Sequence, residues 1–109
     1  MNEIYNIILT PYAENNIDHI INYLEENASE QVADKVKKGI FNAIKGLEKM
    51  PERHGILQLV TDKEITYRRV LKWSYKIIFH IKASKKQVII VDLTHSKQNP
   101  QQLISRLSE

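Results

Sequence analysis

The stretch Tyr75–Lys82, which reads YKIIFHIK, decides the fold of this chain. Its residues alternate in the pattern of a β-strand that has one covered and one open face. The side chains on the first face are those of Tyr75, Ile77, Phe79 and Ile81. The side chains on the second face are those of Lys76, Ile78, His80 and Lys82. Because the first face is apolar throughout, we expect the core to pack against it.

Three further stretches around this strand have the composition of strands. Residues 67–71 precede it and are joined to it by a turn at residues 73–74, and residues 56–60 are long enough for one more short strand. Gln87–His95 follows it and is apolar on both faces in its middle. A strand with two apolar faces is typical of the centre of a sheet, so we expect Gln87–His95 to lie there.

The N-terminal part of the chain changes from the period of a strand to that of a helix. Residues 4–9 are mostly β-branched and apolar, which predicts a strand. Thr10 and Pro11 form a helix start, because threonine caps a helix and proline suits its first position. Apolar residues then recur at helical spacing, which predicts an amphipathic helix over residues 11–26.

A second helix follows after a short turn. Asn27 or Ser29 can cap its start, and Met50 with Pro51 ends it, because the residue before a proline is disfavoured in the helical region. Two helices so closely joined form a hairpin. Within the second helix Gly39 and Gly46 are seven residues apart and lie near one face, where they permit close approach of another segment.

These elements define the fold class. A short third helix is expected to start at Asn99 and Pro100 and to carry Leu103, Ile104 and Leu107. The predicted order is βααβββ with this C-terminal helix, an α+β fold in one domain over residues 1–109. We expect the helical hairpin to pack on one face of a mostly antiparallel, twisted sheet.

A two-helix hairpin covers only one face of a sheet, so the other face is predicted to be open. That face presents Lys76, His80 and Lys82 with Ile78 among them. Cations mixed with aliphatic side chains favour a surface that a partner covers. A plainer interpretation is that Lys76 and Lys82 only keep an apolar strand from aggregating.

Composition narrows the class of protein. The chain has 109 residues and no cysteine, so we expect a modest single core without disulfide or thiolate chemistry. Its longest apolar runs, residues 77–79 and 88–91, are too short to cross a membrane, and its N-terminus does not have the pattern of a signal peptide. We therefore predict a cytoplasmic protein without a membrane partner.

Charge is distributed unevenly along the chain. Residues 1–50 contain five lysines and eight acidic residues, a net charge of −3. Residues 51–109 contain seven lysines, four arginines and five acidic residues, a net charge of +6. A segregated positive half suits an anionic partner, either nucleic acid or an acidic protein segment, although a solvated lysine-rich surface has the same composition.

The order and spacing of several short motifs resemble the RelE/ParE superfamily of bacterial toxins. These are Leu9-Thr10-Pro11 with Ala13, Ile17, Ile20 and Tyr23, then residues 47–55, Tyr67-Arg68-Arg69-Val70, residues 75–79, residues 88–91, and His95 with Asn99-Pro100 and Leu103. The resemblance covers residues 4–103. It implies the fold derived above and the toxin role in a type II toxin–antitoxin system. A toxin of this kind inhibits growth until a small antitoxin, with a partly disordered acidic segment, binds it, in some cases within a larger assembly.

One branch of the superfamily, the RelE-like toxins, cuts mRNA on the ribosome without metal. If this chain does so, Arg69 and Lys76 are the candidates for holding the phosphate, and His80 or His95 for proton transfer. The chain departs from that branch at Lys76, where arginine is typical, and after His95, where an aromatic residue is typical.

The other branch, the ParE-like toxins, poisons DNA gyrase by binding to it. We favour this branch, because the ending His95-x-x-x-Asn99-Pro100-x-x-Leu103 is similar to it, with Lys97 the nearest cation. A third hypothesis is a module that binds antitoxin but is not toxic. The residues predicted to contact a partner are Arg69, Lys76, Ile78, His80, Lys82, His95 and Lys97. We assign no metal and no cofactor.

Overall fold

The computed structural model describes residues 4–57 and 65–95 of the chain. Its helices and strands are β1 (Asn6–Leu9), α1 (Pro11–Asn27), α2 (Glu30–Lys45), β2 (Arg68–Lys72), β3 (Tyr75–Lys82) and β4 (Gln87–His95). Single turns of 3-10 helix occur at Gly46–Glu48, Pro51–Arg53 and Ala83–Lys85. The predicted βααβββ order is confirmed up to His95. The helix expected from Asn99 lies outside the described residues.

Side-chain caps fix the start of both helices. The Thr10 hydroxyl accepts a hydrogen bond from the Ala13 amide at 3.2 Å, and it donates one to the Ile90 carbonyl in β4 at 2.8 Å. Ser29 caps α2 by accepting from the Val32 amide at 3.1 Å, so the second of the two candidate caps is the correct one. The Thr10 hydroxyl thus both starts α1 and ties it to the sheet.

The four strands form one sheet in the order β1-β4-β3-β2. β1 pairs with β4 in parallel, whereas β4 with β3 and β3 with β2 are antiparallel. β4 therefore lies between two strands, as its two apolar faces predict. Its ladder with β3 is interrupted at Ile78/Phe79, where Ile78 pairs with Asp92 and Phe79 with Ile90. Val91 is the extra residue of this β-bulge.

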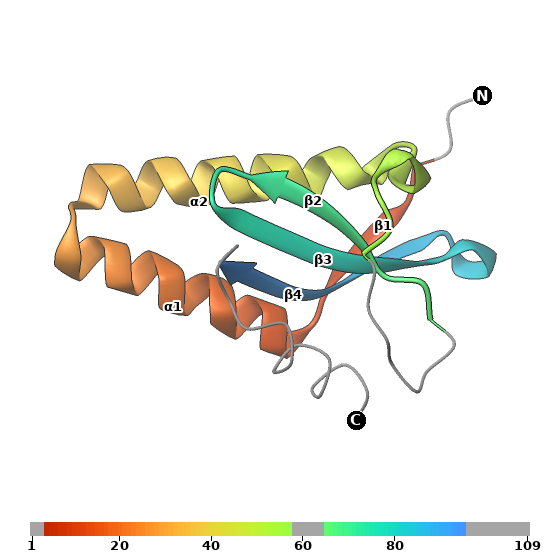
Figure 1. The fold of residues 1–109 in the computed structure, drawn as a ribbon, viewed down its shortest axis with the longest axis horizontal. Coiled ribbons are helices and arrows are strands. Elements are labelled where there is room, and N and C mark those ends of the chain that lie inside the picture. The colour runs from red at the N-terminus through yellow and green to blue at the C-terminus, as the bar shows by residue number, and fades with distance from the viewer. Residues whose placement is uncertain (1–3, 58–64, 96–109) are drawn as a thin grey trace.

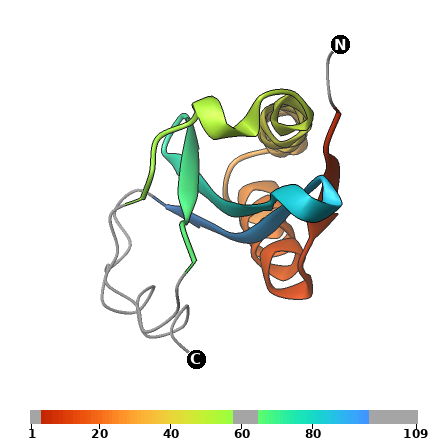
Figure 2. The same cartoon turned by 90° about the vertical axis from the view of Figure 1, so that its right-hand side faces the viewer.

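Both helices pack on the same face of the sheet, as Figure 1 and Figure 2 show. The core between them contains Ile77 and Phe79 of β3, with Tyr75 and Ile81 at its margin. The α1 residues Ala13, Ile17 and Ile21 and the α2 residues Ala33, Ile40 and Ile44 cover these side chains. The predicted covered face is confirmed. Within the described residues no helix is long and apolar enough to cross a membrane.

The segment before β2 is long enough for a short strand over residues 56–60. Its described part, which ends at Leu57, forms only an isolated bridge between Ile56 and Arg68. Arg68 explains this arrangement, since its guanidinium donates to the carbonyl oxygens of Glu52 at 3.0 Å and His54 at 2.8 Å. The loop is therefore held at the edge of β2 by the Arg68 side chain together with two backbone hydrogen bonds, from Leu57 to Tyr67 and from Arg69 to Gly55, and not by a regular strand ladder.

The β2–β3 turn contacts α2 at a glycine. A Cβ atom added to Gly39 would lie 2.3 Å from Cη2 of Trp73, so only glycine leaves room for the indole ring. Gly46, the second glycine predicted to permit close approach, would meet no atom within 4 Å. The prediction is therefore confirmed for Gly39 and wrong for Gly46.

Replacing Gly39 by alanine should move Trp73 away from α2. The added methyl group cannot share the space of the ring, while alanine itself favours the helix by roughly 0.5–1 kcal/mol, so the fold should persist. Trp73 is the only tryptophan of the chain, so its fluorescence reports the change directly. We expect a red-shifted emission maximum and stronger quenching by acrylamide. Gly46→Ala is the matched control, and identical spectra for both variants would contradict this interpretation.

Candidate functional site

The face of the sheet opposite the helices carries the predicted cations. In the β2–β3 ladder Arg69 pairs with Ile78 and Leu71 with Lys76, and paired residues point to the same face. His80 and Lys82 follow at two-residue intervals on β3. We call the surface formed by Arg69, Lys76, His80 and Lys82 the cationic face. The structure brings these four residues to one side of the sheet, and their contact with a partner stays a prediction.

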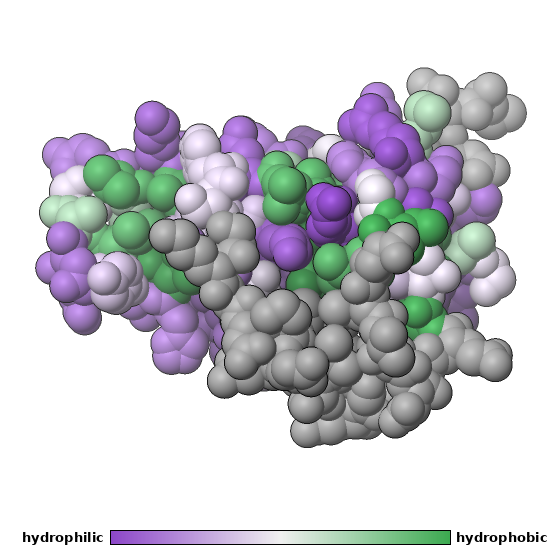
Figure 3. Space-filling view, viewed as in Figure 1, coloured by the Kyte–Doolittle hydropathy of each residue, from purple (hydrophilic) through white to green (hydrophobic). Residues whose placement is uncertain are grey.

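Apolar side chains lie between these cations. Ile8 of β1 is 40% exposed, and it pairs with Ile89, which pairs in turn with His80. Leu71 at the other end of the sheet is 54% exposed. Figure 3, viewed from this side, shows hydrophobic and hydrophilic residues side by side. This surface therefore suits a partner segment that mixes apolar and acidic side chains.

Ile78 is not part of this exposed surface, contrary to the prediction. Its side chain is fully buried in a small second cluster with Tyr67, Leu57 and Val91. The cause is the loop before β2, which runs back along that strand through a hydrogen bond from the Leu57 amide to the Tyr67 carbonyl at 2.8 Å. Part of the predicted open face is therefore covered by the chain itself.

His80 is half-buried beside this cluster. Its ring meets Tyr67 edge to face, with 5.9 Å between the ring centroids. Burial lowers the pKa of His80, and the neighbouring charge of Lys82 lowers it further. The imidazole is therefore neutral at pH 7, so that Arg69, Lys76 and Lys82 supply the positive charge of the face.

His95 lies on the helix side of the sheet and not with the other candidates. Its ring meets Tyr75 edge to face at 5.8 Å, and Tyr75 packs against the main core. The bulge in β4 explains this placement, because one extra residue reverses which positions point to the helices. The candidate ribonuclease residues are thus divided, with Arg69, Lys76 and His80 on the cationic face and His95 on the helix side. Lys97 lies outside the described residues.

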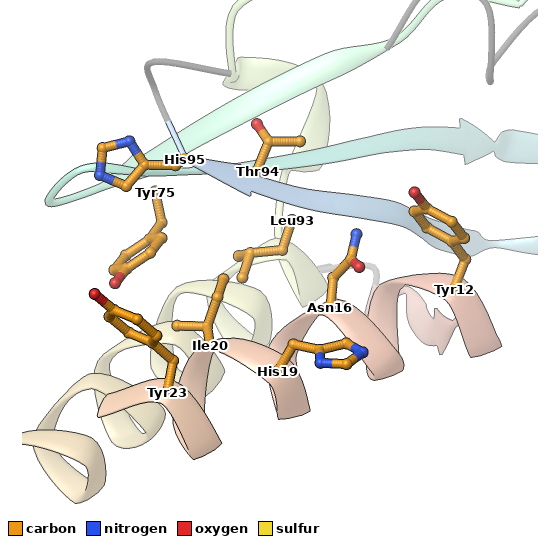
Figure 4. A pocket seen from close by; sticks show the side chains of 9 residues that line it. All are labelled: Tyr12, Asn16, His19, Ile20, Tyr23, Tyr75, Leu93, Thr94 and His95. Atoms are coloured by element: carbon orange, nitrogen blue, oxygen red, sulfur yellow. The ribbon is translucent and has the colours of Figure 1, made fainter. Parts of the chain in front are cut away.

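His95 lines a groove between α1 and the end of β4. The groove has a volume of about 410 Å³ and is lined by Tyr12, Asn16, His19, Ile20, Tyr23, Tyr75, Leu93, Thr94 and His95. Figure 4 shows Tyr23, Tyr75 and His95 gathered at one end and Tyr12, Asn16 and His19 at the other. Among the residues that the structure describes, the lining has no carboxylate, lysine or arginine. It therefore suits an uncharged side chain of a partner better than a phosphate.

A buried carboxylate stands behind this groove. Asp92 is 1% exposed and accepts a hydrogen bond from the Asn16 amide at 2.6 Å and from the Leu93 backbone amide at 2.7 Å. Sequence reasoning missed this pair. The available signal was a single acidic residue within an apolar strand, and nothing in the pattern identifies its partner 76 residues away. The bond fixes α1 to β4 next to the bulge.

No group of three histidine or acidic side chains comes together as metal ligands in the described ranges 4–57 and 65–95. His54, the other histidine with a perturbed pKa, lies at the opposite end of the core against Phe79. Burial lowers the pKa of His54, and Arg53 and Arg68 lower it further. Its position gives it a packing role.

The helical hairpin packed on one face of a mostly antiparallel sheet is the fold that the resemblance to RelE/ParE toxins implied. A family model described as "ParE toxin of type II toxin-antitoxin system, parDE" matches residues 7–100. The chain belongs to this family of ParE toxins. A search of curated proteins gave no match.

Solved structures support the same fold. A chain of the "Chromosomal ParDE TA system from P. aeruginosa" aligns with a TM-score of 0.65 and 17% identity, over 85% of this chain and 97% of that one. A chain of the toxin-antitoxin complex RelBE2 from Mycobacterium tuberculosis aligns with a TM-score of 0.57 and 16% identity, over 84% and 91%. At this level of identity the similarity concerns the fold alone.

Replacing Asn16 by alanine should destabilise the protein. The buried Asp92 carboxylate would lose its side-chain donor, and a hydrogen bond to a charged group contributes roughly 1.5–3 kcal/mol. Asn15→Ala is the matched control, because Asn15 is an exposed asparagine on the same helix. Urea unfolding should show a lower free energy of unfolding for Asn16→Ala only. Equal free energies of unfolding for Asn16→Ala and Asn15→Ala would show that the Asn16–Asp92 hydrogen bond contributes nothing to stability.

Stability should fall as the pH drops below about 6.5, the ordinary pKa of histidine. Since burial lowers the pKa of His80 and His54, the unfolded chain binds protons there that the folded chain does not. The stabilisation is therefore complete above pH 6.5 and is lost on acidification. His80→Gln should lose less free energy of unfolding between pH 7.5 and pH 5.5 than the wild type. An equal loss of free energy of unfolding in the variant and the wild type would contradict the assignment of this pH dependence to His80.

Proposed function

We propose that this protein is the toxin of a type II toxin–antitoxin pair and that it acts by binding DNA gyrase, not by cutting RNA. The observation that carries the proposal is the division of the candidate residues between two faces of the sheet. Arg69 and Lys76 lie on the cationic face, whereas His95 lies with Tyr75 on the helix side. The match to the ParE family model supports the same branch.

RNA cleavage needs a proton acceptor, a proton donor and a phosphate clamp around one phosphorus atom. His95 is separated from the cationic face by the sheet. His80 shares that face with Arg69, which pairs with Ile78 two positions away, and with Lys76, which is four positions or about 13 Å away along the strand. Such a row suits an extended acidic surface better than a single scissile phosphate.

The antitoxin is proposed to cover the cationic face and to extend into the groove beside α1. Both compared structures are toxin–antitoxin assemblies by their titles, which supports a partner of this kind. An acidic segment would pair with Arg69, Lys76 and Lys82, while its apolar residues would cover Ile8 and Leu71. Uncharged side chains would then enter the groove lined by Tyr23 and Tyr75. Segments that fold on binding can wrap such large surfaces.

The direct test is inducible expression of the protein alone in a bacterium. Gyrase poisoning should produce double-strand breaks and an SOS response, and purified gyrase with plasmid DNA should accumulate cleaved complexes. Ribosome-dependent cleavage would instead leave mRNA cut within codons, and that result would establish the RelE-like alternative. Normal growth at full expression would indicate a module that binds antitoxin without toxicity.

Charge reversal on the cationic face should reduce growth inhibition without unfolding the protein. Removing one partner of an interfacial charge pair costs about 2–5 kcal/mol, so Arg69→Glu and Lys76→Glu should weaken target binding by more than tenfold. Lys35→Glu on the exposed surface of α2 is the matched control, with the same change in net charge. The measurement is growth after induction, with circular dichroism to verify folding. If Arg69→Glu and Lys76→Glu both inhibit growth fully, the target binds another surface of the protein.

A further inference from the structure

The turn between β2 and β3 exposes two large apolar side chains. Trp73, in the turn itself, is 52% exposed, and Leu71, which pairs with Lys76 near the end of β2, is 54% exposed. Neither is needed to fill the core, since the core clusters contain other residues of β2 and β3. Leu71 points to the cationic face and the Trp73 ring lies against α2, so the two side chains flank the end of the hairpin. Exposed aromatic and aliphatic residues at the tip of a hairpin are typical of contacts with another protein.

The backbone at Trp73 is in a conformation that its side chain disfavours. Its φ angle is +53°, in the left-handed region, at the first of the two residues that join the strands. Hairpins of this kind favour glycine there, and a residue with a Cβ atom costs roughly 1–2 kcal/mol. Folding stability alone would therefore favour glycine at this position.

The indole is nevertheless held in one place. Its ring edge lies over Gly39 in α2, where any larger residue would collide with it. The Lys72 ammonium lies 4.7 Å from the ring centroid, a cation–π contact. An exposed aromatic side chain that is already fixed loses little conformational entropy on binding, which makes it an efficient anchor.

The surroundings of this anchor are positively charged. Lys72 covers the indole, and Lys76 is paired with Leu71 across the hairpin. We propose that Trp73 and Leu71 are the apolar anchor by which this toxin holds its protein target, through a pocket on the target that is rimmed by carboxylates. The inference rests on the proposed function, because it assigns the surface that meets the target.

A nucleic-acid base is a less suitable occupant. Base stacking needs a free aromatic face, and the Lys72 ammonium already lies over the indole. The adjacent anchor residue is Leu71, which offers a base no stacking surface. Both features suit packing into an apolar protein pocket.

Trp73→Gly tests the proposal, because glycine suits the backbone of the turn while the anchor is lost. We expect the variant to fold, with a melting temperature within a few degrees of the wild type by circular dichroism, and to lose growth inhibition at an equal protein level. Met50→Gly is the matched control. Met50 also has a positive φ, of +49°, and is 62% exposed, but it lies in the α2–β2 connection. This control should remain fully inhibitory.

Leu71→Ser is the second variant, which keeps the test decisive if Trp73→Gly does not fold. At matched expression, the growth inhibition that this variant causes should be at least tenfold weaker than that of the wild type. If the wild type inhibits growth and either Trp73→Gly or Leu71→Ser inhibits it to the same extent, the anchor proposal is overturned but the proposed function is not. A wild type that does not inhibit growth would overturn the proposed function and this inference with it. Quenching of Trp73 emission by a single-stranded RNA oligonucleotide would overturn the choice of a protein partner.

Discussion

The attachment of α1 to β4 is the interaction on which the rest of the structure depends. Hydrogen bonds join these elements across long stretches of sequence, from both the amide and the hydroxyl of Thr10 to the Ile90 carbonyl and from Asn16 to Asp92. Apolar packing of α1 against the sheet accounts for most of the buried surface, but by itself it does not fix the position of the helix along β4. The polar contacts do so, because a buried carboxylate without its donor is costly. They hold the hairpin on one face, and the opposite face is thereby left for a partner.

A core built on one side of a sheet has an electrostatic consequence. The basic half of the sequence supplies β2, β3 and β4, and Arg69, Lys76 and Lys82 of these strands lie on the cationic face. Two copies that met sheet to sheet would bring these like charges together, which costs several kcal/mol. An acidic chain meets no such barrier. The charge pattern therefore selects against self-association through this face and favours a partner of the opposite sign.

Much of this arrangement could be predicted from the sequence. The alternation in Tyr75–Lys82 identified the covered face, and the two side-chain caps marked the starts of α1 and α2. The environments of Ile78 and His95 were not predictable in this way. Ile78 is covered by Leu57 and Tyr67, which a loop brings back, and the path of a loop leaves no periodic signal. His95 changes sides because β4 contains a bulge, and a pattern of period two cannot show one extra residue.

The bulge also bears on mechanism. If β4 ran as a regular strand through all of Val88–His95, alternation from Val88 and Ile90 would direct His95 to the cationic face. The bulge at Val91 shifts that alternation, so that Leu93 completes the core and His95 turns to the groove beside Tyr75. The bulge thus separates this histidine from Arg69 and Lys76, which are left as part of a row of charges with apolar neighbours on the opposite face. Such a row favours the proposed binding role over catalysis through His95.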